Sequence, residues 1–305
     1  MTASIFIDGA AGTTGLEIRE RLEPRTDLTL VTLPEDRRKD ADARREAINA
    51  ADVVILCLPD DAAREAVALI DNPDTRVIDA SSAFRVADGW TYGFPELGFD
   101  VAAADRVSNP GCYPTGFLAL VVPLVRAGVL PADWPLTVNA VSGYSGGGKA
   151  LINRFADEPD LAFRGYGYSL AHKHVPEMQR HAGLVHPPLF APSVARAFRG
   201  MIVEVPVPLA ALPTAPSRSA MVDALHATFD AAPLITVHDD QPDELLMQVD
   251  AAPNDRLDLW VFADPAGRQA RLVAMLDNLG KGASGAAVQN LNLMIGADPL
   301  AGLVY

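Results

Sequence analysis

The stretch "SIFIDGAAGTTG" (residues 4–15) passes from a short apolar run into a turn with three glycines. Its first five residues predict a buried β-strand, and the periodic segment that follows at residues 14–22 predicts a helix. A turn of this kind lets the backbone approach a pyrophosphate closely, while the helix N-terminus faces the negative charge. The stretch therefore predicts a nucleotide-binding βα unit at the start of the chain.

The glycines are spaced G-x-x-G-x-x-G instead of G-x-G-x-x-G, so a purely structural turn is the alternative reading. The position of this glycine turn inside a βα unit at the start of the chain favours nucleotide binding. We expect the turn to contact a cofactor through Gly9, Ala11, Gly12, Thr13, Thr14 and Gly15.

Further strand and helix patterns alternate through the first third of the chain. Strands are predicted at residues 28–33, 52–59 and 75–81 because these runs are almost continuously apolar. Helices are predicted between them at residues 41–50 and 61–70, the latter capped by Asp60 and Asp61. Repeated βα units imply a parallel, doubly wound sheet with ligands at the carboxyl ends of its strands.

The segment "PEDRRKD" (residues 34–40) follows the second predicted strand, where an acidic residue often binds the ribose of NAD. Glu35 or Asp36 would favour NAD, whereas Arg37, Arg38 and Lys39 can hold a 2′-phosphate. A solvated charged loop is the alternative for any one residue. The three adjacent cations favour NADP, with Arg37 and Arg38 as its ligands.

From about Pro135 the pattern changes, because strand-like segments follow one another with few helices between them. The segments "LTVNAVSG", "GMIVEVPVPL", "LITVHD" and "LLMQVDA" are followed by a hairpin pattern, "RLDLWVFAD" and "RQARLVAML" around "PAG". A final helix is predicted at residues 284–296. The sequence thus predicts a doubly wound α/β nucleotide-binding domain and a second, α+β domain with a mixed or antiparallel sheet.

Composition limits the classes of partner. The chain has 305 residues, 49% of them apolar, which is enough for two well-buried cores. No apolar run approaches the roughly 18 residues of a membrane span and no signal-peptide pattern is present, so we expect a cytoplasmic protein that has no membrane partner. A net charge of −14 argues against nucleic acid. Two cysteines cannot form a disulfide framework, and both are expected to be thiols.

One of the two cysteines lies in "SNPGCYPTGF" (residues 108–117), between Pro-Gly and Tyr-Pro. The apolar segment after it predicts a buried helix with Pro114 in its first turn, so Cys112 lies at or just before the helix N-terminus. Amides there stabilise a thiolate and can also hold an oxyanion. Cys112 is therefore a candidate nucleophile, whereas Cys57, inside "VVILCLP", has the surroundings of a core residue.

A nucleophile needs an acid–base partner, and three of the six histidines lie in "AHKHVPEMQRHAG" (residues 171–183). His172 and His174 share one face if this segment is extended. A zinc site is the alternative, but no third and fourth ligands occur at a recognisable spacing. We therefore expect no metal and favour acid–base chemistry, with His172 and His174 both as candidates.

Five motifs together resemble a known family. They are "NPGCYPT", "HKHVPE", "SGYSGGGK" (residues 142–149), "DASSAFR" (residues 79–85) and "DNLGKGASGAAVQNLN" (residues 277–292). They look like the shorter form of N-acetyl-γ-glutamyl-phosphate reductase, an enzyme of arginine biosynthesis. The resemblance covers essentially the whole chain. The related aspartate-semialdehyde dehydrogenases share "SSAFR" but lack the cysteine and histidine motifs as a pair.

The resemblance implies roles for individual residues, and by motif position it favours His172 over His174 as the acid–base residue. Arg85 matches the family's phosphate-binding arginine, and its planar donors suit a phosphate. Asn109 either donates to the carbonyl or phosphate oxygen or only fixes the turn before Cys112. Lys149 follows three glycines and is available to an anion, with a flexible loop as the alternative. Two further expectations complete the assignment: His174 as a substrate ligand, and Ser81 and Asn290 as cofactor ligands.

The resemblance also implies a domain division and a partner. We expect residues 1–111 with 284–305 to form an α/β Rossmann-like domain that binds NADP. Residues 112–283 are expected to form the α+β catalytic and oligomerisation domain of a homo-oligomer, a dimer or tetramer. The substrate is expected to be a small acyl phosphate, reduced by NADPH through a thioester on Cys112.

Three alternatives stay open from the sequence. The same chemistry can act on aspartyl phosphate or on a carrier-linked amino-adipyl or glutamyl phosphate. A zinc hydrolase would use His172, His174 and Cys112, and a redox sensor would bind NADP and use Cys112 only as a switch. Arg85 and the histidine motif disfavour the sensor, which has no need of them.

Overall fold

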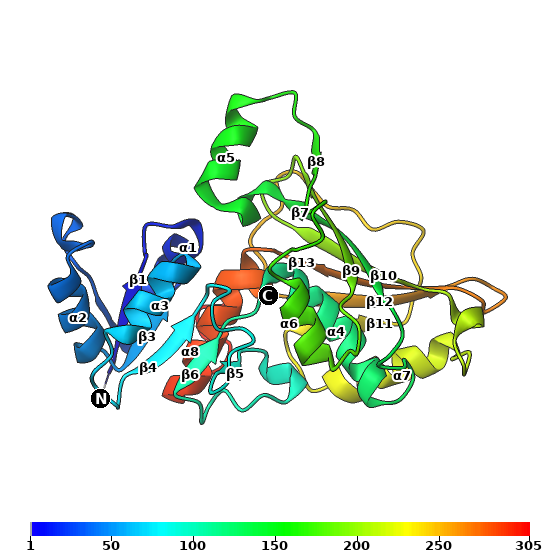
Figure 1. Cartoon of the computed structure of the whole chain (residues 1–305), viewed down its shortest axis with the longest axis horizontal. Coiled ribbons are helices and arrows are strands. Elements are labelled where there is room, and N and C mark those ends of the chain that lie inside the picture. Colours follow the sequence, from blue (N-terminus) through cyan, green and yellow to red (C-terminus); the bar gives the residue numbers. More distant parts are fainter. Residues whose placement is uncertain (1) are drawn as a thin grey trace. The chain divides into compact units, whose positions relative to one another are not determined.

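The computed structural model describes residues 2–305, and the chain separates into two compact units. The first contains the chain up to Gly111 and Ala283–Leu303, and the second contains Cys112–Gly282 and Val304–Tyr305. Each unit has its own sheet (Figure 1).

The first unit is built on a six-stranded parallel sheet in the order β2-β1-β3-β4-β6-β5. The chain moves from β1 outward to β2 and then returns to the other side of β1, so the strand order reverses between β1 and β3. Crevices at such reversals bind ligands outside the carboxyl ends of the strands. The strands are β1 (Ala3–Asp8), β2 (Leu28–Val31), β3 (Val53–Leu56), β4 (Arg76–Asp79), β5 (Thr91–Tyr92) and β6 (Arg106–Ser108).

Helices cover both faces of this sheet because its strands are apolar on both sides. Ile5 and Ile55 pack in one core with α1 (Thr13–Leu22) and α8 (Gly285–Ile295). Figure 1 draws α8 as the red helix beside this sheet. Phe6 packs in the other core. The helices on that side are α2 (Ala41–Ala50) and α3 (Asp60–Ala68).

One expectation about this unit is wrong. Asp60 and Asp61 do not cap α3, because Pro59 occupies the N-cap position and no side chain bonds there. The Asp60 carboxylate instead accepts hydrogen bonds from the backbone N–H and the hydroxyl of Ser82, at 2.9 and 2.6 Å.

The second unit contains a seven-stranded mixed sheet in the order β11-β12-β13-β10-β7-β9-β8. β7 with β9 and β11 with β12 are the parallel pairs, and the remaining neighbours are antiparallel. The strands are β7 (Thr137–Gly143), β8 (Phe163–Gly165), β9 (Leu189–Ala195), β10 (Met201–Val207), β11 (Ile235–His238), β12 (Leu257–Ala263) and β13 (Ala270–Leu276). The expected fold class is confirmed, including the hairpin of β12 and β13.

The helix α4 (Cys112–Arg126) lies at the centre of this unit and packs against β10, β13 and two further helices. Every residue from 113 to 124 is buried. The other helices are α5 (Gly148–Asp157), α6 (Val175–Ala182) and α7 (Arg218–Phe229), with short 3₁₀ turns at Glu35–Arg37 (η1), Pro95–Leu97 (η2), Tyr144–Gly147 (η3) and Leu209–Ala211 (η4), and a π-helical turn at Gly280–Ser284 (η5).

The strand expected at "LLMQVDA" (residues 245–251) is not formed. β12 is already paired with β11 on one side and β13 on the other, so this segment has no strand to pair with there. Leu246 and Val249 are 58% and 67% exposed. No helix among residues 2–305 is long and apolar enough to cross a membrane.

Candidate active site

The glycine turn of the first unit has the tight backbone expected of it. Gly9 has a φ of +89°, and a Cβ there would lie 2.3 Å from the carbonyl oxygen of Cys57. Only glycine fits this position. Gly12 donates to the carbonyl of Gly9 at 2.9 Å and is the N-cap of α1, so its turn leads directly into the helix N-terminus. Thr13 and Thr14 form the first turn of α1, and Ala11 lies in the turn itself.

A cavity of about 810 Å³ lies beside this turn at the carboxyl ends of β1 and β2. Arg38 lines it, and so do Gly9 and Ala11. Arg37 does not belong to this lining, and its guanidinium lies 3.9 Å from Asp40. The full lining is Phe6, Ile7, Asp8, Gly9, Ala10, Ala11, Arg19, Leu30, Val31, Thr32, Leu33, Pro34, Glu35, Asp36, Arg38, Lys39, Arg44, Leu58 and Ala62.

The turn "DASSAFR" follows β4 and is held together by its own side chains. The Ser81 hydroxyl donates to Oδ2 of Asp79 at 2.7 Å and accepts from the N–H of Ala83 at 3.0 Å. Arg85 is buried, and its Nε and Nη2 donate to the carbonyl oxygens of Asn109 and Ala80, at 3.0 and 3.2 Å. The buried guanidinium therefore ties this turn to the turn that precedes Cys112.

Asp79 is fully buried at the end of β4. Burial raises the pKa of its carboxyl to about 6, although hydrogen bonds from Ser81 and the charge of Arg85 lower it. Its Oδ1 accepts no hydrogen bond from residues 2–305.

Asn109 and Asn290 form a second buried polar pair in the first unit. Nδ2 of Asn290 donates to Oδ1 of Asn109 and to the carbonyl of Gly93, both at 3.0 Å. Nδ2 of Asn109 donates to the carbonyl of Ala283 at 2.9 Å. Both amide groups of Asn109 are thus used within the protein, which favours its turn-fixing role over direct donation to a substrate.

Two buried acceptors in this region remain available to a ligand. Oδ1 of Asn290 and Oδ1 of Asp79 each lack a donor among residues 2–305. Buried acceptors without donors are costly, so they indicate a place where a ligand brings N–H or O–H groups. A nicotinamide nucleotide carries such groups on its ribose and carboxamide, and the first unit therefore fits this cofactor.

Cys112 is the first residue of α4 in the second unit, where the helix amides face it. The backbone of Gly282 lies against it, since a Cβ at Gly282 would be 2.9 Å from the Cβ of Cys112. The next residue, Tyr113, donates from its hydroxyl to the carbonyl of Ser193 at 3.1 Å and accepts from Tyr166 at 3.3 Å. Burial raises the pKa of both phenols, so they stay protonated.

The predicted histidines are grouped around Tyr113. The rings of His172 and His174 lie 6.2 and 5.9 Å from its ring, and 4.8 Å from each other. The backbone N–H of His174 donates to Nδ1 of His172 at 3.2 Å. Burial, reinforced by the charge of Lys173, lowers the pKa of His172 to about 4, so this ring is neutral at physiological pH.

Two further sequence expectations concern Lys149 and a metal site. Lys149 lies in the first turn of α5, is exposed, and forms no ion pair or hydrogen bond with residues 2–305. Within the same range, no group of three or more His, Cys, Asp or Glu side chains is arranged to hold a metal ion.

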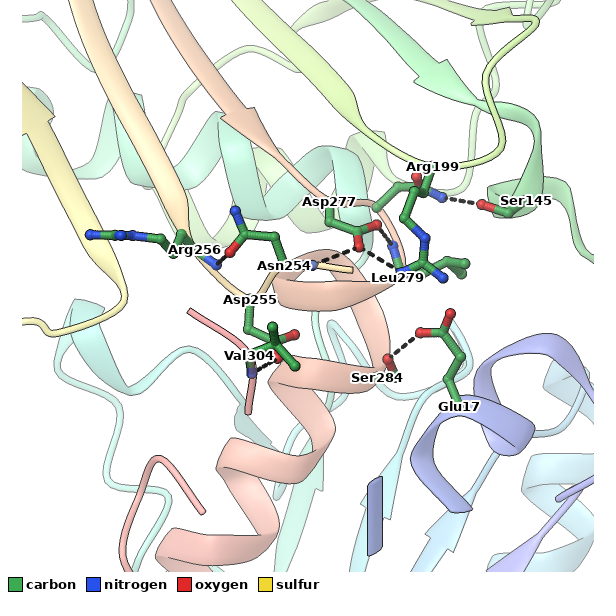
Figure 2. A network of polar contacts seen from close by, with 11 residues as sticks. Glu17, Ser145, Arg199, Asn254, Asp255, Arg256, Asp277, Leu279, Ser284 and Val304 are labelled. Atoms are coloured by element: carbon green, nitrogen blue, oxygen red, sulfur yellow. Dashed lines mark hydrogen bonds and ion pairs between the residues drawn. The ribbon is translucent and has the colours of Figure 1, made fainter. Parts of the chain in front are cut away.

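Figure 2 shows a buried network that the sequence did not reveal. Nη1 of Arg199 donates to Oδ2 of Asp277 at 2.8 Å, and Oδ1 of Asp277 accepts from the N–H of Leu279 at 2.9 Å. The carbonyl of Asp277 accepts from the N–H of Gly282 at 3.0 Å. Asp277 thus orders the segment that lies against Cys112. Arg199 and Asp277 lie 78 positions apart in the sequence, so no local sequence pattern predicts their ion pair.

Two family models match the chain: the semialdehyde dehydrogenase dimerisation domain at residues 112–278, and the semialdehyde dehydrogenase NAD binding domain at residues 34–104. An N-acetyl-γ-glutamyl-phosphate reductase of Trichormus variabilis is 48% identical over 317 residues, covering 98% of each chain. One named N-acetyl-γ-glutamyl-phosphate reductase 2, from Pseudomonas putida, is 51% identical over 313 residues and covers 97% of this chain and 98% of its own.

Solved structures with the same fold are more distant in sequence. Aspartate semialdehyde dehydrogenase II of Vibrio cholerae, complexed with ASA, has a TM-score of 0.72 at 17% identity, with 97% of this chain and 99% of that chain covered. The Candida albicans aspartate semialdehyde dehydrogenase with NADP has a TM-score of 0.67 at 16% identity, with 96% and 99% covered. The resemblance seen in the sequence motifs is confirmed, and the chain belongs to the N-acetyl-γ-glutamyl-phosphate reductases of the semialdehyde dehydrogenase family.

Proposed function

We propose that this protein reduces N-acetyl-γ-glutamyl phosphate to N-acetyl-glutamate γ-semialdehyde and phosphate, with NADPH as reductant, in arginine biosynthesis. The observation that carries the proposal is that Cys112 is the first residue of a buried helix. The next residue, Tyr113, packs its ring against the rings of His172 and His174. The close relatives carry the name of this reaction.

Cys112 acts as the nucleophile. Its thiolate, stabilised by the amides that open α4, attacks the γ-carbonyl carbon, and the carbon–oxygen bond to phosphate breaks. The thioester forms, and the leaving phosphate takes one proton from solvent. When bound, the nicotinamide supplies the hydride that reduces the thioester carbonyl. The resulting oxyanion then collapses, the carbon–sulfur bond breaks, and the aldehyde and the thiolate are released.

His172 holds a proton at a defined atom. An N–H can only donate, so Nδ1 of His172 is the acceptor of the His174 contact and the neutral ring carries its proton on Nε2. A neutral imidazole in this tautomer stabilises an oxyanion by hydrogen bonding, as in other enzymes with a lowered histidine pKa. This favours a donor role for His172 over the removal of the thiol proton that the sequence suggested. His174 fixes that tautomer and orientation.

Residues of the first unit bind the cofactor and supply positive charge to the phosphate group of the substrate. The glycine turn, Arg38 and Asn290 bind NADPH, and Arg85 contributes positive charge toward the phosphate while it anchors the turn before Cys112. Asn109 and Ser81 keep this anchor in place. Lys149 is exposed and available to an anion.

We assign the second unit to oligomerisation as well as chemistry, because the family model that matches residues 112–278 describes a dimerisation domain. The assembly we propose is a homodimer or homotetramer. We also assign the protein to the cytoplasm, a reducing compartment in which Cys57 and Cys112 stay as thiols without a disulfide.

The deciding experiment is the reverse reaction, followed by nicotinamide absorbance in the presence of phosphate or arsenate. We expect NADP reduction with N-acetyl-glutamate γ-semialdehyde and much slower reduction with aspartate semialdehyde. A preference for aspartate semialdehyde, or for a carrier-linked aldehyde, would reassign the substrate while keeping the chemistry.

A further inference from the structure

The cavity beside the glycine turn contains an arginine that the sequence analysis did not consider. Arg44, in the first turn of α2, directs both Nε and Nη2 to the same oxygen of Asp8, at 3.0 and 2.8 Å. The two side chains are only 15% and 7% exposed. A guanidinium that donates two hydrogen bonds to one carboxylate is held in one orientation, whereas the exposed side chains of Arg38 and Lys39 are not.

Part of this guanidinium remains unused. Nη1 of Arg44 makes no hydrogen bond with any group in residues 2–305, although Arg44 lines the cavity. Arg38 and Lys39 line the same cavity and are exposed. The cavity therefore contains one fixed donor group and two flexible cations.

The position of the cavity identifies the kind of group it accepts. It lies at the end of β2, where enzymes that prefer NAD place an acidic residue on the ribose 2′-hydroxyl. Here the residue directly after β2 is Thr32, and the acids Glu35 and Asp36 come only in the next turn. A neutral residue at this point, with cations around it, suits a 2′-phosphate.

We propose that Arg44, oriented by Asp8, is the residue that distinguishes NADPH from NADH by binding the 2′-phosphate. The inference rests on the proposed use of NADPH, and it places Arg44 ahead of Arg37 and Arg38, the two ligands expected from the sequence. Asp8 is a positioning residue, because its carboxylate holds the guanidinium and touches no cofactor group in this assignment.

The test is direct binding of two cofactor fragments to the full chain by calorimetry. Wild type should bind 2′,5′-ADP more tightly than 5′-AMP. Arg44→Gln should weaken 2′,5′-ADP binding by about 10- to 100-fold, the effect of losing charge-assisted hydrogen bonds, and leave 5′-AMP binding nearly unchanged. Arg45→Gln is the matched control, since Arg45 is the next residue of α2, is exposed and pairs with Asp71. It removes the same charge and should change neither affinity.

A double variant separates this role from simple neutralisation of Asp8. If Arg44 only cancelled that carboxylate, Asp8→Asn with Arg44→Gln would restore binding of 2′,5′-ADP. We expect the double variant to remain as weak as Arg44→Gln. Restored binding, or an equal loss for both fragments in Arg44→Gln, overturns the proposal.

The fragments also keep this inference separate from the proposed function. Binding of 2′,5′-ADP requires no acyl phosphate and no turnover. A wild-type protein that prefers 2′,5′-ADP but does not oxidise N-acetyl-glutamate γ-semialdehyde would contradict the proposed reaction alone. A protein that turns over but binds both fragments equally would contradict the Arg44 assignment alone.

Discussion

Nδ1 of His172 accepts a hydrogen bond from the backbone N–H of His174 at 3.2 Å, and this contact decides which nitrogen of the ring carries the proton. The proton lies on Nε2, and burial lowers the pKa of the ring to about 4. The histidine motif thus presents a neutral donor over the whole physiological pH range.

The activity profile should reflect this neutral ring. Because the pKa is lowered, His172 stays neutral as the pH falls through 6.5, the ordinary histidine value, and it becomes protonated only near pH 4. We expect kcat to show no inflection near pH 6.5 that belongs to His172. His172→Asn should reduce kcat by about 10²- to 10⁴-fold on the plateau. An inflection near pH 6.5 that disappears in His172→Asn would disprove the neutral-donor role.

Cys112→Ser should abolish the reaction without loss of the cofactor. Serine keeps the shape of the side chain, but its hydroxyl has a far higher pKa, so no ester should accumulate at neutral pH. The measurement is turnover together with NADPH fluorescence on binding. Residual turnover well above that of a mock purification would show that another group is the nucleophile.

The two cysteines should differ sharply in alkylation by iodoacetamide. Burial, with the negative charges of Asp79 and Asp8, raises the pKa of Cys57 to about 12, so only about one molecule in 10⁴ carries that thiolate at pH 8. Cys112 lies at a helix N-terminus and should react much faster. Peptide mass spectrometry of wild type and Cys112→Ser measures this difference. Rapid labelling in Cys112→Ser would mean that Cys57 is reactive after all.

Asp79→Asn should change how stability depends on pH. Since the folded-state pKa of Asp79 is raised to about 6, the folded protein holds a proton that the unfolded chain has lost above about pH 4. This carboxyl therefore favours the folded state at low pH, and that contribution is lost as the pH rises from about 4 to about 6. The unfolding free energy of wild type relative to Asp79→Asn should fall by about 1–3 kcal/mol across this window. Urea unfolding at several pH values tests it, and parallel curves for the two proteins would refute it.

Gly282→Ala should disturb the nucleophile selectively. A Cβ at this position meets the Cβ of Cys112 at 2.9 Å and the carbonyl of Asp277 at 3.1 Å, so one of these groups must move. Displacement of a reacting group by about 1 Å can cost about 10²-fold in rate. We expect kcat to fall by about 10- to 100-fold with little change in the KM for NADPH. An unaltered kcat would show that Cys112 tolerates this shift.

The sequence predicts those parts of the molecule that local patterns determine. The apolar runs of β1, β3 and β4 and the turn at Gly9 were identified because parallel strands and tight turns have local signatures. The two-residue strand β5 is too short to have one. Residues 245–251 were predicted as a strand, but β12, the next strand along the chain, is already paired on both sides and this segment forms no strand.

The site was predictable to a similar degree. The surroundings of Cys112 and the motif of His172 indicate chemistry from residue type alone, and their roles remain predictions until variants are measured. The Arg44–Asp8 and Arg199–Asp277 pairs could not be predicted, because each joins residues brought together only by the register of distant elements. The tautomer of His172 depends on one backbone N–H in a turn, which residue identity does not specify.

The helix that begins at Cys112 has no solvent-facing side over twelve consecutive residues, so it cannot fray or adjust while the rest of the second unit stays intact. The sulfur is in place only when the whole surrounding core is assembled. Displacement of the nucleophile should therefore be absent until this unit unfolds. The part of the activity loss that comes from Cys112 should coincide with cooperative unfolding of this unit.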